Sequence, residues 1–199
     1  MAAGAQGGVS HERCTELART MKITFRRVEM GDLPALRQLA EQTFRDAWQA
    51  ANDPVHFEAY CSAHFSPEQL AAELAHPGAE FYFGQQGNTP VAYLKLNINQ
   101  LPEASAQLWE PLWPGLAVQI ERIYVIEWLQ GHGIGESLLA FAEKRARQEG
   151  AAWLWLSVWQ QAPQAVRFYE KNGFSRFGVE TFWVGADPQP DWLMRKWCR

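Results

Sequence analysis

QIERIYVIEWLQGHGIG, residues 119–135, joins a strand pattern to a glycine-rich turn. Gln119 to Val125 alternates and is rich in β-branched and aromatic residues, which predicts a half-buried strand. Gly131, Gly133 and Gly135 follow at every other position, directly before a helical pattern. Residues without side chains tolerate positive φ and let a ligand approach the backbone, and a helix N-terminus directs free N–H groups toward it. The stretch therefore predicts a cradle for an anion.

Two common phosphate-binding motifs do not match this turn. A dinucleotide fingerprint requires G-x-G-x-x-G, and its third glycine position holds Glu136, so Gly135 comes one residue early. A phosphate loop of the Walker type ends in Gly-Lys-Ser/Thr, whereas Gly135 precedes Glu136 and Ser137. Both motifs are therefore excluded.

Two segments, in the right order, resemble the GNAT superfamily of N-acetyltransferases. The turn Gln130–Gly135 is similar to the Q/R-x-x-G-x-G/A loop of that family, with its two glycines at Gly133 and Gly135. The segment AVRFYEKNGF, residues 165–174, is similar to the A-x-x-x-Y-x-x-x-G-F signature that follows the loop in the same family, and it places Tyr169 at the tyrosine position. The resemblance extends from residue 22 to residue 197.

This resemblance implies the fold and the co-substrate. It implies one α/β domain with a mixed, mostly antiparallel sheet of about seven strands, flanked by helices, with a cofactor slot between the central strands. It also implies acetyl-CoA as co-substrate and no metal. The glycine loop would bind the pyrophosphate, and peptide N–H groups of the central strand would hold the acetyl carbonyl and the pantetheine. The implied cofactor-binding residues are Ile123, Tyr124, Val125, Gln130, Gly131, His132, Gly133, Ile134 and Gly135.

A finer resemblance points to the bacterial PaiA-type branch, which is associated with acetylation of spermidine and spermine. The chain departs from the pattern at Ala162, where the family often has asparagine, and at His132, where it usually has a basic residue. The matching segments are Thr43-Phe44, Asp53-Pro54, Phe65-Ser66, Glu73-Leu74, Tyr93–Asn97, Ile120–Val125, Thr181-Phe182 and Asp191–Met194.

Glu121 and Tyr169 are the candidate catalytic residues. Attack of an amine on a thioester requires a group that takes the amine proton and a group that protonates the thiolate. Glu121, on the central strand, is the candidate base, although it could instead pair with Arg122 while water relays the proton. The motif makes Tyr169 the candidate acid, although a tyrosine on a helix face can equally be a core residue.

The remaining pattern predicts helices and strands in one domain, residues 21–199, after a flexible extension, residues 1–20. Asp32 and Ser66 are expected to cap helices. The run WLWLSVW, residues 153–159, predicts a strand buried on both faces. The predicted elements are strands at 22–28, 80–85, 91–99, 119–125, 152–159, 174–183 and 192–197, and helices at 33–48, 55–63, 67–75, 136–149 and 163–171, with a long loop at 100–115.

Composition limits the classes of partner. The net charge is −4, with no basic block, which argues against nucleic acid as a partner. No apolar run is long enough for a membrane span, and three cysteines without metal-binding spacing suit a reducing compartment. We therefore expect a cytoplasmic protein, monomeric or homodimeric, that acts on a small-molecule amine.

The sequence is compatible with more than one class of acceptor. A peptide or antibiotic amine is an alternative to a polyamine, and a non-catalytic acyl-CoA-binding regulatory domain is an alternative to an enzyme. Acids in the expected acceptor region could meet a polycation or could simply be solvated. They are Asp53, Glu58, Glu103 and Glu110.

Overall fold

The computed structural model describes residues 22–102 and 115–198. The expected extension at residues 1–20 and most of the expected loop at 100–115 lie outside these residues. Within the described ranges the chain alternates helices and strands much as its sequence predicts. In chain order they are β1 (Ile23–Arg27), α2 (Leu33–Trp48), α3 (Pro54–His64), α4 (Pro67–Ala75), β2 (Ala79–Gln86), β3 (Thr89–Ile98), β4 (Ala117–Val125), α5 (Ile134–Gln148), β5 (Trp153–Trp159), α6 (Pro163–Lys171), β6 (Ser175–Val184) and β7 (Asp187–Trp197).

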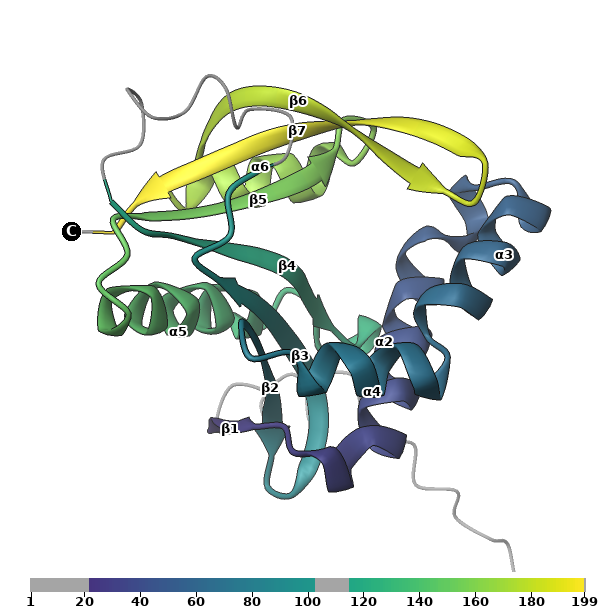
Figure 1. Cartoon of the computed structure of the whole chain (residues 1–199), viewed down its shortest axis with the longest axis horizontal. Coiled ribbons are helices and arrows are strands. Elements are labelled where there is room, and N and C mark those ends of the chain that lie inside the picture. The colour runs from purple at the N-terminus through teal and green to yellow at the C-terminus, as the bar shows by residue number, and fades with distance from the viewer. Residues whose placement is uncertain (1–21, 103–114, 199) are drawn as a thin grey trace, which may run out of the picture.

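One seven-stranded sheet organises the molecule, with the strand order β1-β2-β3-β4-β5-β7-β6. All neighbouring strands are antiparallel except β4 and β5, which are parallel. These two strands pair only between residues 117–119 and 153–155. Beyond that point they diverge, and the sheet opens into two halves (Figure 1). The predicted mixed sheet with a slot between its central strands is confirmed.

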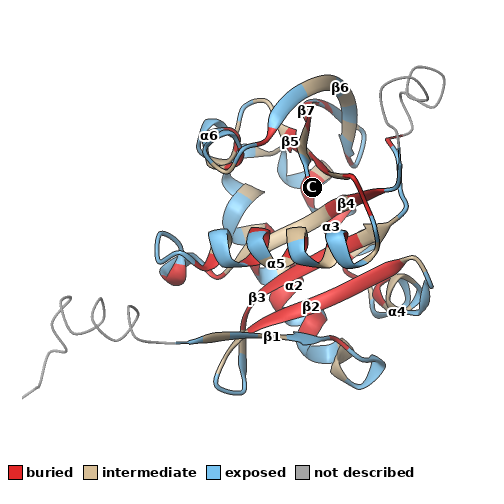
Figure 2. Ribbon diagram, turned by 90° about the vertical axis from the view of Figure 1, so that its left-hand side faces the viewer, coloured by how far each residue is buried: buried red, intermediate tan, exposed pale blue. Residues whose placement is uncertain are grey.

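Helices cover both faces of the β1–β4 half. α5 packs on one face, against β3, β4 and β5, and α2 and α4 pack on the other (Figures 1 and 2). The inner face of α5 is apolar at helical spacing, with Leu138, Leu139, Ala142 and Ala146 buried, while its outer face is exposed. Gly150, at φ +73°, ends this helix. In the described part of the chain, no helix is long and apolar enough to cross a membrane.

The two expected helix caps have different outcomes. Ser66 caps α4 as predicted, since its hydroxyl accepts a hydrogen bond from the Gln69 N–H at 3.2 Å. Asp32 lies at the predicted N-cap position of α2, but its side chain makes no cap hydrogen bond to that helix, because a 3-10 turn (Met30–Asp32) runs straight into α2 and leaves Asp32 in a helical conformation. Its carboxylate instead accepts hydrogen bonds from Arg26, at 2.7 and 3.0 Å.

The last strand begins earlier than the sequence predicts. The prediction started it at Trp192, whereas β7 starts at Asp187 and includes Pro188 and Pro190. The Pro190 carbonyl accepts a hydrogen bond from the turn after β5 at 3.0 Å, so this residue faces the β5 side. Pairing with β5 begins one residue later, so neither proline is required to donate an N–H there. This correction brings residue 191 into the sheet.

Candidate active site

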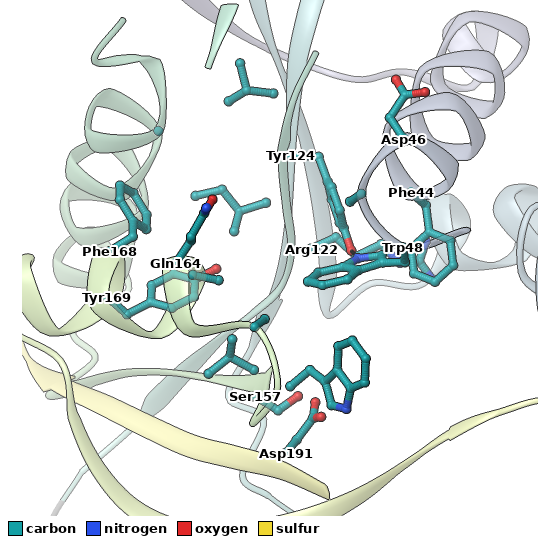
Figure 3. A pocket seen from close by; sticks show the side chains of 18 of the residues that line it. Phe44, Asp46, Trp48, Arg122, Tyr124, Ser157, Gln164, Phe168, Tyr169 and Asp191 are labelled. Carbon is teal, nitrogen blue, oxygen red and sulfur yellow. Dashed lines mark hydrogen bonds between the residues drawn. The ribbon is translucent and has the colours of Figure 1, made fainter. Parts of the chain in front are cut away.

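A cavity of about 770 Å³ lies where β4 and β5 diverge. Its walls come from β4 and β5, from α2 and α6, and from the β6–β7 pair, which reaches across toward α3 (Figures 1 and 3). Residues 157–159 of β5 line this cavity, which explains why Ser157 and Trp159 are only partly buried. The expectation that the whole of β5 is buried on both faces is therefore wrong at its C-terminal end.

β4 carries an irregularity beside the cavity. Lys95 of β3 lies opposite Arg122, and Leu96 lies opposite Ile120, so Glu121 is an extra residue on β4. Such a bulge bends a strand and changes the direction of the side chains and peptide groups around it. From this point to residue 125, the β4 edge facing β5 pairs with no strand in the part of the chain that the structure describes. Its peptide groups are therefore available to a ligand in the slot.

The glycine turn leads from β4 into α5 as the sequence predicts. Gly133 is the N-cap of α5 at φ +81°, and Gly131 has φ +76°. A Cβ added at either glycine would meet nothing within 4 Å, so the space beside the backbone is open. The amide of Gln130 braces the turn by donating to the Val125 carbonyl at 3.1 Å. The N-terminal N–H groups of α5 receive no side-chain cap.

Only some of the residues predicted to bind the cofactor line the cavity. Gly135 lines the cavity, and a Cβ there would lie 3.1 Å from the ring of Phe168 on α6, so its small size also sets how closely α5 and α6 approach. His132 and Gly133 are exposed and do not line the cavity, and Ile134 is buried in the core. The others that line the cavity are Ile123, Tyr124, Val125, Gln130 and Gly131.

Tyr169 lies on the buried face of α6 and points into the cavity (Figure 3). Its ring packs edge-on against Phe168 and Phe174, at centroid distances of 5.3 and 5.7 Å. Burial raises the pKa of the Tyr169 hydroxyl, and the nearby Tyr124 raises it further. The phenol is therefore protonated at neutral pH, as a proton donor must be.

Glu121 reaches the cavity from a dense cluster of charged residues. Its carboxylate accepts hydrogen bonds from the Lys95 ammonium and the Asn97 amide, each at 2.7 Å. Arg122 lies 3.3 Å from it and forms a two-point pair with Glu73 of α4, at 2.9 and 3.0 Å. The ion pair with Arg122 that the sequence left open is present. Each oxygen of the Glu121 carboxylate therefore accepts a hydrogen bond.

Asp191 is a second acid in the cavity, and its surroundings differ from those of Glu121. It lies on β7 between Trp159 of β5 and Glu180 of β6, with 6% of its surface exposed. One carboxylate oxygen, Oδ1, is buried and makes no hydrogen bond with any residue that the structure describes. Burial raises the pKa of Asp191 to about 7; Glu180 adds to this, and the hydroxyl of Ser157 opposes it.

Aromatic rings surround the end of the cavity near Asp191. Trp48 of α2 donates a hydrogen bond from its indole N–H to the Tyr124 hydroxyl at 3.0 Å, and its ring meets that of Trp159 edge-on at 5.9 Å. Phe44 stacks on Tyr60 at 5.0 Å. This end of the cavity is therefore largely apolar, and Asp191 is its most deeply buried acid. Further rings that line it are Phe65 and Phe182.

Sequence reasoning missed several residues that line the cavity and selected others that do not. Asp53 caps α3 by accepting from two N–H groups, and Glu58 pairs with Arg45 on the surface, so neither lines the cavity. Glu103 and Glu110 lie outside the described residues. The sequence assigned no role at the site to Gln164 or Asp191, both of which line the cavity. Phe44 and Asp191 stand in segments of PaiA-type resemblance, but the predicted last strand began one residue after Asp191.

Comparisons with known proteins agree with this geometry. The model of the acetyltransferase (GNAT) family matches residues 33–174. An uncharacterized N-acetyltransferase from Lactobacillus delbrueckii subsp. lactis is 32% identical over 169 residues, which cover 85% of this chain and 94% of that protein. An uncharacterized N-acetyltransferase from Mycobacterium tuberculosis is 27% identical over 165 residues, 83% of this chain and 97% of its own.

Solved structures show the same fold. The PaiA N-acetyltransferase from Thermoplasma acidophilum, crystallised in complex with coenzyme A, superposes with a TM-score of 0.68 at 22% identity, over 89% of this chain and 99% of its own. A GNAT protein from Rhodopseudomonas palustris superposes with a TM-score of 0.67 at 18% identity, over 89% and 98% of the two chains.

Proposed function

The chain belongs to the GNAT family of acetyltransferases, and from this premise we propose that it acetylates a primary amine of a small molecule by direct attack. As a member of this family it is an acyltransferase that uses acetyl-CoA. The observation that carries the proposal is the open slot between β4 and β5, with an unpaired strand edge on one side and Tyr169 on the other. A polyamine is one candidate acceptor, suggested by the PaiA-type resemblance of the sequence.

The glycine turn fits the pyrophosphate of acetyl-CoA. Open space beside Gly131 and Gly133, together with the uncapped N–H groups of α5, suits a doubly charged anion that the backbone binds. Peptide groups of Ile123, Tyr124 and Val125 would hold the pantetheine and the acetyl carbonyl along the free edge of β4. Bound in this way, the co-substrate supplies the acetyl group as a thioester.

Tyr169 is proposed to protonate the departing thiolate. Its hydroxyl faces the slot, and its raised pKa keeps the proton in place until a strong base forms beside it. The N–H groups of β4 after the bulge would stabilise the negative charge that develops on the carbonyl oxygen. Glu121 or a water molecule is the sequence-based candidate for accepting the proton of the amine.

A turnover screen tests this function. The full chain is incubated with acetyl-CoA and with polyamines, aminoglycosides or N-terminal peptides, and thiol release is measured. Acetylation of a small-molecule amine is the expected result. Acetylation of peptides alone would replace the acceptor class, and acetyl-CoA binding without turnover of any amine would indicate a non-catalytic binding domain.

Tyr169→Phe tests the proposed acid in the same assay. Phenylalanine keeps the ring that packs on Phe168 and Phe174, so the fold and the affinity for acetyl-CoA should be preserved. Loss of a general acid should lower kcat by about 10²–10⁴-fold. A kcat equal to that of the wild type would assign Tyr169 to the core alone.

A further inference from the structure

Two residues at the same end of the cavity each carry one buried polar atom without a partner. The atoms are Oδ1 of Asp191 and the indole Nε1 of Trp159, neither of which forms a hydrogen bond with any part of the chain that the structure describes. The two residues are paired in register across β5 and β7. An unsatisfied buried polar atom costs about 1–3 kcal/mol, and more when it is charged, so such atoms are rare unless a ligand completes them.

Among the residues that the structure describes, the groups that act on Asp191 include no cation. Glu180 on β6 is an acid, Ser157 on β5 contributes a neutral hydroxyl, and Tyr124 on β4 is a protonated phenol. The pKa of Asp191, raised to about 7, reflects this lack of compensation. A carboxylate in such a place is stabilised by a positive charge that enters from outside.

The neighbouring rings select the kind of cation. Trp48, Trp159 and Tyr124 present aromatic surface around Asp191, and aromatic faces attract a desolvated ammonium group. The same rings would contact an apolar body better than a second charged group. Asp46, another acid on the α2 wall, is exposed and points away from Asp191 (Figure 3).

We propose that Asp191 binds the ammonium group of the acceptor and takes its proton, and that the acceptor is a primary amine with one positive charge and an apolar or aromatic body. This inference rests on the proposed acetyl transfer. Asp191, rather than Glu121, is then the base, since each oxygen of Glu121 already accepts a hydrogen bond, from Lys95 or Asn97, and the carboxylate also pairs with Arg122.

The step balances without another reactant. The ammonium loses one proton to the Asp191 carboxylate, and the nitrogen lone pair then attacks the thioester carbonyl carbon. A C–N bond forms and the C–S bond breaks, with the sulfur keeping the bonding electron pair. The thiolate takes a proton from Tyr169, and the second nitrogen proton lost by the amide product returns to the phenolate. Asp191 releases its own proton to solvent as the amide leaves.

Calorimetric titration at pH 8 tests the binding claim without acetyl-CoA. The probes are 2-phenylethylamine, its uncharged analogue 2-phenylethanol, and spermidine. The wild type should bind 2-phenylethylamine at least tenfold more tightly than 2-phenylethanol, and Asp191→Asn should remove this preference. The matched control is Asp32→Asn, which deletes a carboxylate outside the cavity that pairs with Arg26, and it should leave the preference unchanged.

Three results would overturn the proposal. The first is a folded Asp191→Asn variant that keeps the preference for the amine over the alcohol. The second is a wild type that shows no such preference, and the third is binding of spermidine but not of 2-phenylethylamine, which would replace the acceptor class.

Kinetics separate this proposal from the proposed function. For an amine that the wild type acetylates, Asp191→Asn should lower kcat/KM at least a hundredfold while its affinity for acetyl-CoA is unchanged. Equal kcat/KM in the two proteins would overturn the role of Asp191 and leave acetyl transfer intact. Absence of acetyl-CoA binding and of any turnover in the wild type would instead overturn the proposed function.

Discussion

Glu121 and Asp191 face one cavity from opposite halves of the split sheet, and their carboxylates have very different hydrogen-bond and ion-pair partners. Glu121 lies on the β4 bulge and shares Lys95 and Arg122 with Glu73. Asp191 lies on β7 with one carboxylate oxygen unpaired and no cation among the groups that act on it. The β1–β4 half therefore neutralises its buried charges internally, whereas the β5–β7 half leaves one charge to be neutralised from outside.

This difference separates structural acids from functional ones. Moving Glu121 toward a substrate would require it to leave three donors, so its cluster is suited to fixing the β4 bulge and the peptide groups after it. Asp191 has no such bond to break. The two regions should also respond to pH with opposite signs, because the folded state lowers the pKa of Glu73 and raises that of Asp191.

Breaking the charged cluster should have the largest effect on stability. Glu73→Ala leaves Lys95 and Arg122, with 6% and 10% of their side chains exposed, sharing Glu121 alone. Removing one partner from a buried set of ion pairs typically lowers the free energy of unfolding by about 3–5 kcal/mol. Urea denaturation measures the loss. Glu68→Ala, at an exposed position of α4, is the control and should change it by less than about 1 kcal/mol.

The same cluster predicts a loss of stability in acid. Burial pushes the pKa of Glu73 up, but Arg122 and Lys95 lower it by more, so the net pKa is below 4.5. This stabilisation is present at neutral pH and is lost as the pH falls through the folded-state pKa. A Glu73→Ala variant whose stability equalled that of the wild type at pH 7 would show that the cluster does not hold the β4 half together.

Removing the unpaired carboxylate of Asp191 should stabilise the fold, in contrast to removing Glu73. The pKa of Asp191 is about 7 in the folded chain against 3.8 ordinarily, so its ionised form opposes folding. At about 1.4 kcal/mol for each pH unit between these values, the penalty reaches at most ~4 kcal/mol above pH 7 and vanishes below pH 4. Asp191→Asn should thus raise the free energy of unfolding by about 2–4 kcal/mol at pH 8.

Denaturation at several pH values checks this prediction. The gain of Asp191→Asn over the wild type should shrink between pH 8 and pH 4, because the carboxyl of the folded wild type becomes protonated over this range and its buried charge is lost. Asp32→Asn, which removes a paired carboxylate, should be destabilising or neutral at pH 8. A variant at Asp191 less stable than the wild type at pH 8 would mean that this carboxylate has a partner inside the fold.

The glycine turn offers a smaller test, independent of both carboxylates. Gly133→Val would place a branched side chain at φ +81°, where the backbone faces the open space. The affinity for acetyl-CoA should fall at least tenfold, about 1.4 kcal/mol. Calorimetry on the folded Gly133→Val variant measures this affinity. Glu73→Ala and Asp191→Asn are the controls and should bind acetyl-CoA like the wild type. An unchanged affinity in Gly133→Val would remove this turn from the cofactor site.

The smallest effect is expected from an ion pair with similar geometry on the surface. Arg176 and Glu170 are 2.8 Å apart, and each side chain is 44% exposed. Solvent screens such a pair, so Glu170→Gln should change the free energy of unfolding by less than about 1 kcal/mol. A loss as large as that of Glu73→Ala would show that distance rather than burial governs these pairs.

The sequence by itself determined the parts of this protein that depend on neighbouring residues. Gly131 and Gly133 adopt positive φ because the turn between β4 and α5 requires it, and that requirement is visible in the residues themselves. The order of strands and helices follows from local periodicity in the same way. The family resemblance rested on these local signals, and the family match and the fold confirmed it.

Only the tertiary structure decided which acid is neutralised and which is not. The cationic partners of both Glu121 and Glu73 lie on β3 and β4, whereas the groups that act on Asp191 in the described chain lie on β5, β6 and β4. No local sequence pattern indicates such contacts between residues that are distant in the chain. The predicted last strand began at Trp192, one residue after Asp191, whereas β7 includes two prolines where it does not pair with β5. Charge, unlike backbone conformation, is set by neighbours distant in the chain.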